Sequence, residues 1–164
     1  MPDTPPQALD IRQLASDETV PYDLLLLADP SKTVIDRYLS ASTVFVAEMN
    51  RQSVGACVLF PLEAGAVEIK NVAVQPAYQG RGIGTALLSH AIRVAERQGF
   101  KTLCIGTANS SVGQLLLYQK LGFEIDRVKK NFFLKHYDEP LFENGIQCKH
   151  LIWLVRPVVN ADRG

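Results

Sequence analysis

The chain of 164 residues has no excess of charge of either sign. Lysine and arginine together number 17, and aspartate and glutamate also number 17, so the formal net charge at pH 7 is zero. Proteins that attract nucleic acid or anionic membrane surfaces through bulk charge carry a basic excess. The composition therefore predicts neither a nucleic-acid partner nor a membrane partner.

Long hydrophobic segments are also absent. No run reaches the roughly 18 apolar residues that a membrane-spanning helix needs. The first residues, M-P-D-T-P-P, contain neither the basic segment nor the apolar segment of a secretory signal peptide. We therefore expect no signal peptide and no membrane association.

Cysteine is scarce, and Cys57, Cys104 and Cys148 lie far apart in the chain. An odd number without C-x-x-C spacing is not a disulfide framework, and no spacing typical of metal ligands occurs. The pattern indicates reduced thiols, a cytoplasmic protein and no metal. Cys104 stands at the centre of an apolar segment, so we interpret it as a core residue and not as a nucleophile.

The length predicts one domain over residues 1–164, with loosely held ends at 1–7 and 158–164. Hydrophobic periodicity and turn residues predict an α/β fold: a mixed, mostly antiparallel sheet of about seven strands flanked by about four helices. We expect strands at 8–14, 43–49, 53–62, 66–74, 101–107, 123–134 and 147–156, and helices at 21–28, 31–39, 83–98 and 111–121. Ser31 is a predicted helix cap, and Ser111 with Gln114 fits a capping box.

A glycine-rich turn follows the strand at 66–74 and leads directly into a helix. Its sequence is Q-G-R-G-I-G, from Gln79 to Gly84. The first N–H groups of a helix have no partner within it, and the helix dipole adds partial positive charge there. Glycines let the backbone approach a ligand closely, and Arg81 adds a cation. The segment is therefore typical of a diphosphate site, although an ordinary strand–helix turn is the alternative.

Two common nucleotide motifs do not fit this turn. A P-loop needs Lys followed by Ser or Thr after its glycines, and the dinucleotide fingerprint needs G-x-G-x-x-G. The pattern Q/R-x-x-G-x-G/A does fit, and with it the chain resembles the GNAT superfamily of N-acetyltransferases. A second segment, A-N-S-S-V-G-Q-L-L-L-Y-Q-K-L-G-F-E at 108–124, is also similar to that superfamily. The segment at 131–148 resembles its bacterial YvbK-like branch.

The resemblance implies acetyl-coenzyme A as cosubstrate and a sheet that splays between its fourth and fifth strands. By the same resemblance, the edge formed by Val72, Ala73 and Val74 pairs with the pantetheine arm and supplies an oxyanion contact. Asn109 contacts the same arm, with a helix N-cap as the alternative reading. The resemblance also implies that the diphosphate is bound by Gln79, Gly80, Arg81, Gly82, Ile83, Gly84 and Thr85.

Acetylation of an amine requires removal of a proton. An alkyl ammonium has a pKa near 10.4, so the free amine costs about 3 pKa units at pH 7, roughly 4–5 kcal/mol. The resemblance places Glu68 as the general base and Tyr118 as the acid at the departing sulfur. The alternatives are a structural carboxylate, with water or another group as the base, and a tyrosine packed in the core.

The acceptor side is predicted from the loop between the last two strands. Phe133, His136 and Tyr137, with Asp138 and Glu139, suit a cationic amine; a solvated loop is the alternative. The resemblance implies transfer of an acetyl group from acetyl-coenzyme A to a primary amine of a small molecule, by direct transfer. The alternatives are a protein α-amine or lysine acetyltransferase and a non-catalytic acyl-coenzyme A sensor. A homodimer is compatible with the sequence.

Overall fold

The computed structural model describes residues 8–159, so most of the predicted loose ends, at 1–7 and 158–164, lies outside the described residues. Within the described part, the backbone N–H of Val158 donates to the backbone oxygen of Lys101 at 2.9 Å. The chain forms two compact parts. Among the described residues, the first part contains 8–61 and 70–93, and the second contains 62–69 and 94–159. The elements are β1 (Asp10–Gln13), α1 (Tyr22–Ala28), α2 (Lys32–Leu39), β2 (Thr43–Met49), β3 (Gln52–Pro61), β4 (Ala66–Val74), the 3₁₀ helix η1 (Pro76–Tyr78), α3 (Ile83–Arg97), β5 (Thr102–Ala108), α4 (Val112–Lys120), β6 (Glu124–Lys129), α5 (Phe132–His136), β7 (Phe142–Glu143), β8 (Ile146–Gln147) and β9 (Leu151–Pro157).

Seven strands pair in the order β1-β2-β3-β4-β5-β9-β6, and β4 contributes residues to both parts. The β4–β5 pair is parallel, from Ala66 opposite Thr102 to Ile69 opposite Ile105. The pairs β1–β2, β2–β3, β5–β9 and β6–β9 are antiparallel. The predicted mixed, mostly antiparallel sheet is confirmed, with five α-helices in the described chain instead of about four. The splay expected between the fourth and fifth strands concerns the two parts together and stays a prediction.

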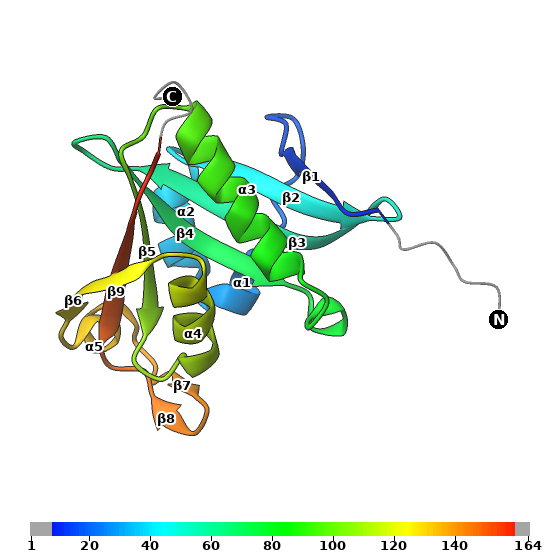
Figure 1. Ribbon diagram of the computed structural model, residues 1–164. Coiled ribbons are helices and arrows are strands. Elements are labelled where there is room, and N and C mark those ends of the chain that lie inside the picture. Colours follow the sequence, from blue (N-terminus) through cyan, green and yellow to red (C-terminus); the bar gives the residue numbers. More distant parts are fainter. Residues whose placement is uncertain (1–7, 160–164) are drawn as a thin grey trace. The chain divides into compact units, whose positions relative to one another are not determined.

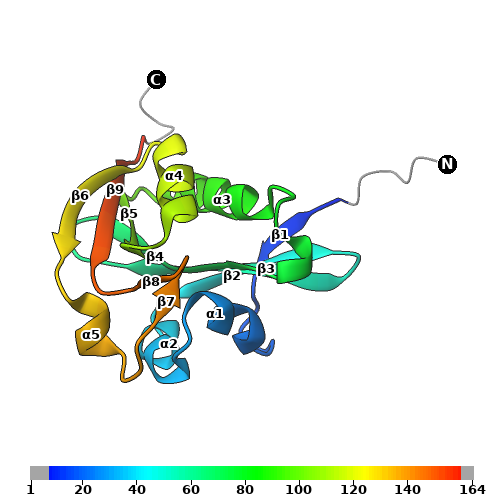
Figure 2. The same cartoon turned by 90° about the horizontal axis from the view of Figure 1, so that it is seen from below.

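In the first part, α1 and α2 cover one face of β2 and β3, and α3 covers the other (Figures 1 and 2). Leu24, Leu25 and Ile35 from the two short helices pack with Ala56 and Val58 of β3. Ser31 Oγ accepts a hydrogen bond from the backbone N–H of Val34 at 3.2 Å, which confirms the predicted cap of α2. Among residues 8–159, no helix is long and apolar enough to cross a membrane.

In the second part, β5, β9 and β6 lie side by side (Figure 1). The strand predicted at 123–134 ends at Lys129, and the helix α5 follows it. Asn131 adopts a left-handed conformation with φ 59°, which ends the extended chain. Phe132 and Phe133 then pack against Cys104, Leu151 and Trp153. Packing of these two half-buried rings therefore overrides the local preference of F-F-L for a strand.

The strand predicted at 147–156 is also shorter, because β9 begins at Leu151. Ile146 and Gln147 instead form β8, which pairs with β7 in a small hairpin. Asn144 and Gly145 make the turn between them with φ 54° and 73°. Asn-Gly is a strong hairpin signal, because both central residues of a type I′ turn need positive φ.

Gly55 of β3 provides a test of packing in the first part. A Cβ atom at this position would lie 3.0 Å from the backbone oxygen of Ala73 and 3.0 Å from Leu87 Cδ1. We expect Gly55→Ala to lower the free energy of unfolding by about 1–3 kcal/mol, because a backbone oxygen has little room to move. Denaturant titrations followed by circular dichroism measure this change.

Gly113 of α4 is the matched control, since a Cβ there would meet no atom within 4 Å. Gly113→Ala is expected to raise the free energy of unfolding by about 0.5–1 kcal/mol, because alanine favours a helix. Equal changes in the two variants would show that the contact at Gly55 does not limit stability.

Candidate active site

The glycine turn in the first part forms as predicted between η1 and α3. Gly80 and Gly82 have φ of 77° and 81°, and a Cβ at either position would meet no atom within 4 Å. Glycine is therefore required here by the backbone conformation and not by crowding. The side chain of Gln79 donates to the backbone oxygen of Val74 at 3.1 Å, which ties the turn to the end of β4.

The start of α3 provides the groups that could bind an anion at this turn. Ile83 is buried and anchors the first turn of the helix in the core, whereas Thr85 is exposed. The guanidinium of Arg81 lies 5.1 Å from the ring centre of Tyr78 and is exposed. Unpaired N–H groups at a helix start, open glycines and a cation together fit an anionic group such as a diphosphate.

Val72, Ala73 and Val74 lie at the end of β4, in the first part. Ala73 is buried, whereas the two valines are half-buried. Their assignment to the pantetheine arm stays a prediction.

Glu68 belongs to the other end of β4, in the second part. It is half-buried and pairs with Cys104 of β5. Burial first, and then the nearby negative charges of Glu68 and Asp126, raise the pKa of the Cys104 thiol to about 11. The Glu68 carboxylate is thus close enough to Cys104 to affect its ionisation. Cys104 itself is 4% exposed and protonated at neutral pH, which agrees with a core cysteine and not a nucleophile.

Hydrogen bonds of the Asn109 side chain connect the segment before β9 to the end of β5. Its Oδ1 accepts hydrogen bonds from the backbone N–H groups of Lys149 and His150, at 2.8 and 3.0 Å. Its Nδ2 donates to the backbone oxygen of Gln147 at 3.2 Å. Both lone pairs of Oδ1 therefore accept hydrogen bonds within the protein. A hydrogen bond from Asn109 to the cofactor stays a prediction, and only the Nδ2 group could donate it.

The capping box predicted for α4 is wrong. Ser111 is the N-cap residue but its side chain makes no capping hydrogen bond; instead its Oγ donates to the carboxylate of Glu143 in β7. Asn144 Nδ2 donates to the backbone oxygen of Ser110 at 2.8 Å. The first turn of α4 contains no acidic residue, so Glu143 supplies negative charge at the positive end of the helix from a distant segment.

Tyr118 lies on α4 and is 5% exposed. The centre of its ring is 6.2 Å from that of Phe123, with the planes tilted by 57°. The ring is therefore part of the core of the second part. The role of its hydroxyl at the departing sulfur stays a prediction.

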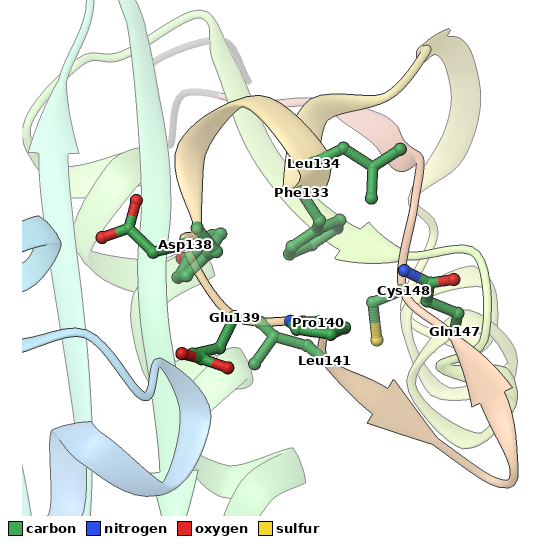
Figure 3. Close-up of a pocket in the computed structure, with 9 residues that line it drawn as sticks. Phe133, Leu134, Asp138, Glu139, Pro140, Leu141, Gln147 and Cys148 are labelled. Carbon is green, nitrogen blue, oxygen red and sulfur yellow. The ribbon is translucent and has the colours of Figure 1, made fainter.

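A pocket of about 170 Å³ lies in the second part, between α5 and β8. Figure 3 shows the ring of Phe133 directed to its middle and the carboxylates of Asp138 and Glu139 on the side away from Cys148. The rings of Phe133 and Tyr137 stack with centres 5.7 Å apart. The lining residues are Phe133, Leu134, Tyr137, Asp138, Glu139, Pro140, Leu141, Gln147 and Cys148. Aromatic and aliphatic side chains beside carboxylates suit an organic cation.

The pocket brings together Phe133 and Tyr137 but not His136, which is not among its lining residues. The ring of His136 instead lies 4.4 Å from that of Phe132. Sequence reasoning missed five lining residues: Leu134, Pro140, Leu141, Gln147 and Cys148. The last four reach the pocket because the chain folds back between α5 and β8. Cys148 is also held by Ser110, with Sγ and Oγ 3.1 Å apart. Among residues 8–159, no group of three or more His, Cys, Asp or Glu side chains is arranged to hold a metal ion.

Comparison with known proteins identifies the family of the chain. Residues 40–125 match the family model of the acetyltransferase (GNAT) domain. The uncharacterized N-acetyltransferase YvbK of Bacillus subtilis (strain 168) is 44% identical over 146 residues, which cover 89% of this chain and 93% of that protein. The crystal structure of a GNAT family acetyltransferase from Elizabethkingia anophelis with acetyl-CoA bound has a TM-score of 0.89 and 46% identity, and the match covers 91% of this chain and 97% of that one.

A shorter match involves an enzyme with a protein substrate. The [ribosomal protein bS18]-alanine N-acetyltransferase of Escherichia coli (strain K12) is 38% identical over 63 residues, which cover 38% of this chain and 43% of that protein. The family model spans more than half of the chain, and YvbK matches most of its length. The predicted resemblance is thereby confirmed: the chain belongs to the GNAT family of N-acetyltransferases.

Proposed function

We propose that the protein transfers the acetyl group of acetyl-coenzyme A directly to the primary amine of a small molecule. The observation that carries this acceptor class is the pocket between α5 and β8. Its lining combines aromatic and aliphatic side chains with polar ones, and Asp138 and Glu139 stand at one side. An amine with an apolar portion fits this arrangement, because the rings receive the apolar portion and the carboxylates attract the ammonium group.

The cosubstrate is held by the first part of the chain. Backbone N–H groups from Gln79 to Thr85 and the Arg81 guanidinium bind its diphosphate. The open glycine positions support this, since no side chain fills the space beside Gly80 and Gly82. The strand edge from Val72 to Val74 pairs with the pantetheine amides, and one of its N–H groups polarises the acetyl carbonyl. When bound, acetyl-coenzyme A supplies the acetyl group as a thioester.

Two side chains of the second part move the protons. Glu68 takes a proton from the ammonium nitrogen of the acceptor, directly or through water. The Tyr118 hydroxyl holds a proton for the sulfur of coenzyme A. Groups placed in this way contribute about 10²–10⁴-fold each to the rate. Glu68 and Tyr118 lie in the same compact part as the pocket, which supports their use in one reaction.

A second candidate acceptor is the α-amine of a protein. The short match to the ribosomal protein alanine acetyltransferase favours it. A terminal amine of a folded protein needs space for the following residues of its chain. The two acceptors therefore differ in whether added residues after the amine are tolerated.

A screen of amines tests the function. Purified protein is mixed with acetyl-coenzyme A and an amine library, and release of the coenzyme A thiol is measured. We expect turnover with small primary amines that carry an apolar portion, and little with peptides of six or more residues. Turnover with peptides alone would replace the small-molecule acceptor by the protein α-amine. Tight binding of acetyl-coenzyme A without thiol release from any amine would favour a sensor.

Gly82 tests the cosubstrate site. We expect Gly82→Asp to weaken coenzyme A binding by about 10-fold or more, because it obstructs the backbone and places a negative charge beside the diphosphate. Gly82→Ala is expected to have a smaller effect in the same direction. Isothermal titration calorimetry with coenzyme A measures both.

Gly99 at the other end of α3 is the matched control. It has φ 76° and no atom within 4 Å of a Cβ, compared with φ 81° and the same open space at Gly82. Gly99→Ala therefore introduces a similar backbone strain and is expected to leave the affinity for coenzyme A unchanged. Equal affinities for wild type and Gly82→Asp would exclude this turn as the diphosphate site.

A further inference from the structure

Asn71 is a polar residue in the buried interior of β4. It is 4% exposed, and it directly precedes Val72, Ala73 and Val74. Asparagine is a poor strand former, and valine or isoleucine would fit this position better on propensity alone. A residue that breaks such a local rule is found most often at a functional site.

The amide of Asn71 has a fixed orientation. One of its terminal atoms lies 3.0 Å from the backbone oxygen of Leu25 in α1. A carbonyl oxygen only accepts, so this atom is Nδ2. Nδ2 also donates to the hydroxyl of Tyr38 in α2 at 3.2 Å. These two hydrogen bonds use both N–H groups of the amide and hold Oδ1 in one direction.

Among residues 8–159, no donor reaches Oδ1 of Asn71, although this atom is buried. The neighbouring Lys70 does not supply one, since its Nζ lies over the rings of Tyr38 and Phe60, at 5.8 and 5.2 Å from their centres. A buried acceptor without a donor costs free energy, and such an atom in a native protein is usually satisfied by a ligand or an ordered water.

We propose that Asn71 Oδ1 accepts a hydrogen bond from the amine nitrogen of the acceptor and orients it for acetyl transfer. The proposal rests on the function proposed above. An ammonium or amine group suits the position because it presents only N–H donors to Oδ1, and the other polar atoms beside the amide, the Leu25 oxygen and the Tyr38 hydroxyl, also accept hydrogen bonds. Asn71 is thus a residue that binds the acceptor amine.

The test compares Asn71→Leu and Asn71→Val with wild type, using an amine that the screen identifies. Leucine has nearly the same size as asparagine, valine is a good strand former, and neither side chain has an atom that accepts a hydrogen bond. We expect both variants to raise KM for the amine by about 10- to 100-fold, with KM for acetyl-coenzyme A within about twofold of wild type. Thermal unfolding identifies the variants that are folded.

Tyr38→Phe is the control for a purely structural effect. It removes one acceptor of Nδ2 but leaves the Leu25 hydrogen bond and Oδ1 in place. We expect its KM for the amine to stay within about twofold to threefold of wild type. An increase as large as that of Asn71→Leu would show that the network, and not Oδ1, matters, and would overturn the proposal.

The remaining outcomes separate this inference from the proposed function. If wild type acetylates the amine and a folded Asn71 variant keeps its KM for that amine, Oδ1 does not bind the acceptor. If KM for acetyl-coenzyme A rises instead, the donor is an amide of the cosubstrate, and the inference is again wrong. If wild type acetylates no amine, the proposed function fails, and the inference fails with it.

Discussion

Tyr118→Phe is expected to lower kcat by about 10- to 1,000-fold while leaving the affinity for acetyl-coenzyme A close to wild type. The substitution removes only the hydroxyl that is proposed to protonate the departing sulfur. The ring is 5% exposed and packs against Phe123, and phenylalanine keeps that packing. Steady-state kinetics with an identified amine measure kcat, and calorimetry measures binding.

Tyr22→Phe is a suitable control, because it also removes a tyrosine hydroxyl with a hydrogen-bond partner. Tyr22 Oη donates to Asp36 Oδ1 at 2.6 Å on the exposed surface of the first part. Its kcat is expected to equal that of wild type. If Tyr118→Phe keeps the wild-type kcat, and chemistry is shown to limit turnover, Tyr118 contributes only to core packing and another group protonates the sulfur.

Glu68→Gln is expected to have the second large effect, and this effect depends on pH. As a base, Glu68 must be ionised while the amine arrives protonated, so kcat/KM of wild type rises with pH and then levels off. Glutamine has nearly the same shape but no basicity. The variant should lose about 10²–10⁴-fold at neutral pH. The deficit should shrink towards high pH, because free amine becomes abundant as the pH approaches its ordinary pKa of about 10.4.

Glu63→Gln controls for the loss of one negative charge. Glu63 is exposed in the turn before β4, and its replacement should leave the pH profile of kcat/KM unchanged. If the profiles of wild type and Glu68→Gln superimpose, Glu68 is not the base, and water or another side chain takes that role.

Cys104 provides an independent measure of the same substitution. The charge of Glu68 contributes to the raised pKa of the Cys104 thiol, after the larger contribution of burial. Glu68→Gln should therefore lower the pH at which Cys104 reacts with a thiol reagent. A shift in this reactivity without a change in kcat/KM would show that the carboxylate is charged and beside Cys104, yet not used as the base.

Short-range signals account for the elements that the sequence determined. The hairpin between β2 and β3 follows from Asn50 and Arg51, which both adopt positive φ. The bounds of β4 follow from its alternating pattern, and the turn before α3 follows from glycines with φ of 77° and 81°. Each of these signals lies within a few residues of the structure that it specifies, so no distant segment was needed to predict it.

The acceptor side depended on contacts between distant segments. Ser111 has a capping-box pattern, but its hydroxyl donates a hydrogen bond to the carboxylate of Glu143, which is 32 residues away. The residues at 132–134 have strand propensity but form part of α5, because the half-buried rings of Phe132 and Phe133 pack against the cluster of Cys104, Leu151 and Trp153. The single free acceptor of Asn71 became visible only when Leu25 and Tyr38 had been placed beside its amide.

The mixed sheet and the glycine turn were therefore determined by the sequence itself, since local periodicity and backbone conformation specify them, and the family followed from the resemblance of the motif segments. The pocket between α5 and β8, the hydrogen bonds of Asn109 to the segment before β9 and the unsatisfied oxygen of Asn71 were decided by the tertiary structure. The physical reason is that burial and hydrogen bonding compete with local propensity, and each of these depends on partners that only the folded chain brings within contact distance.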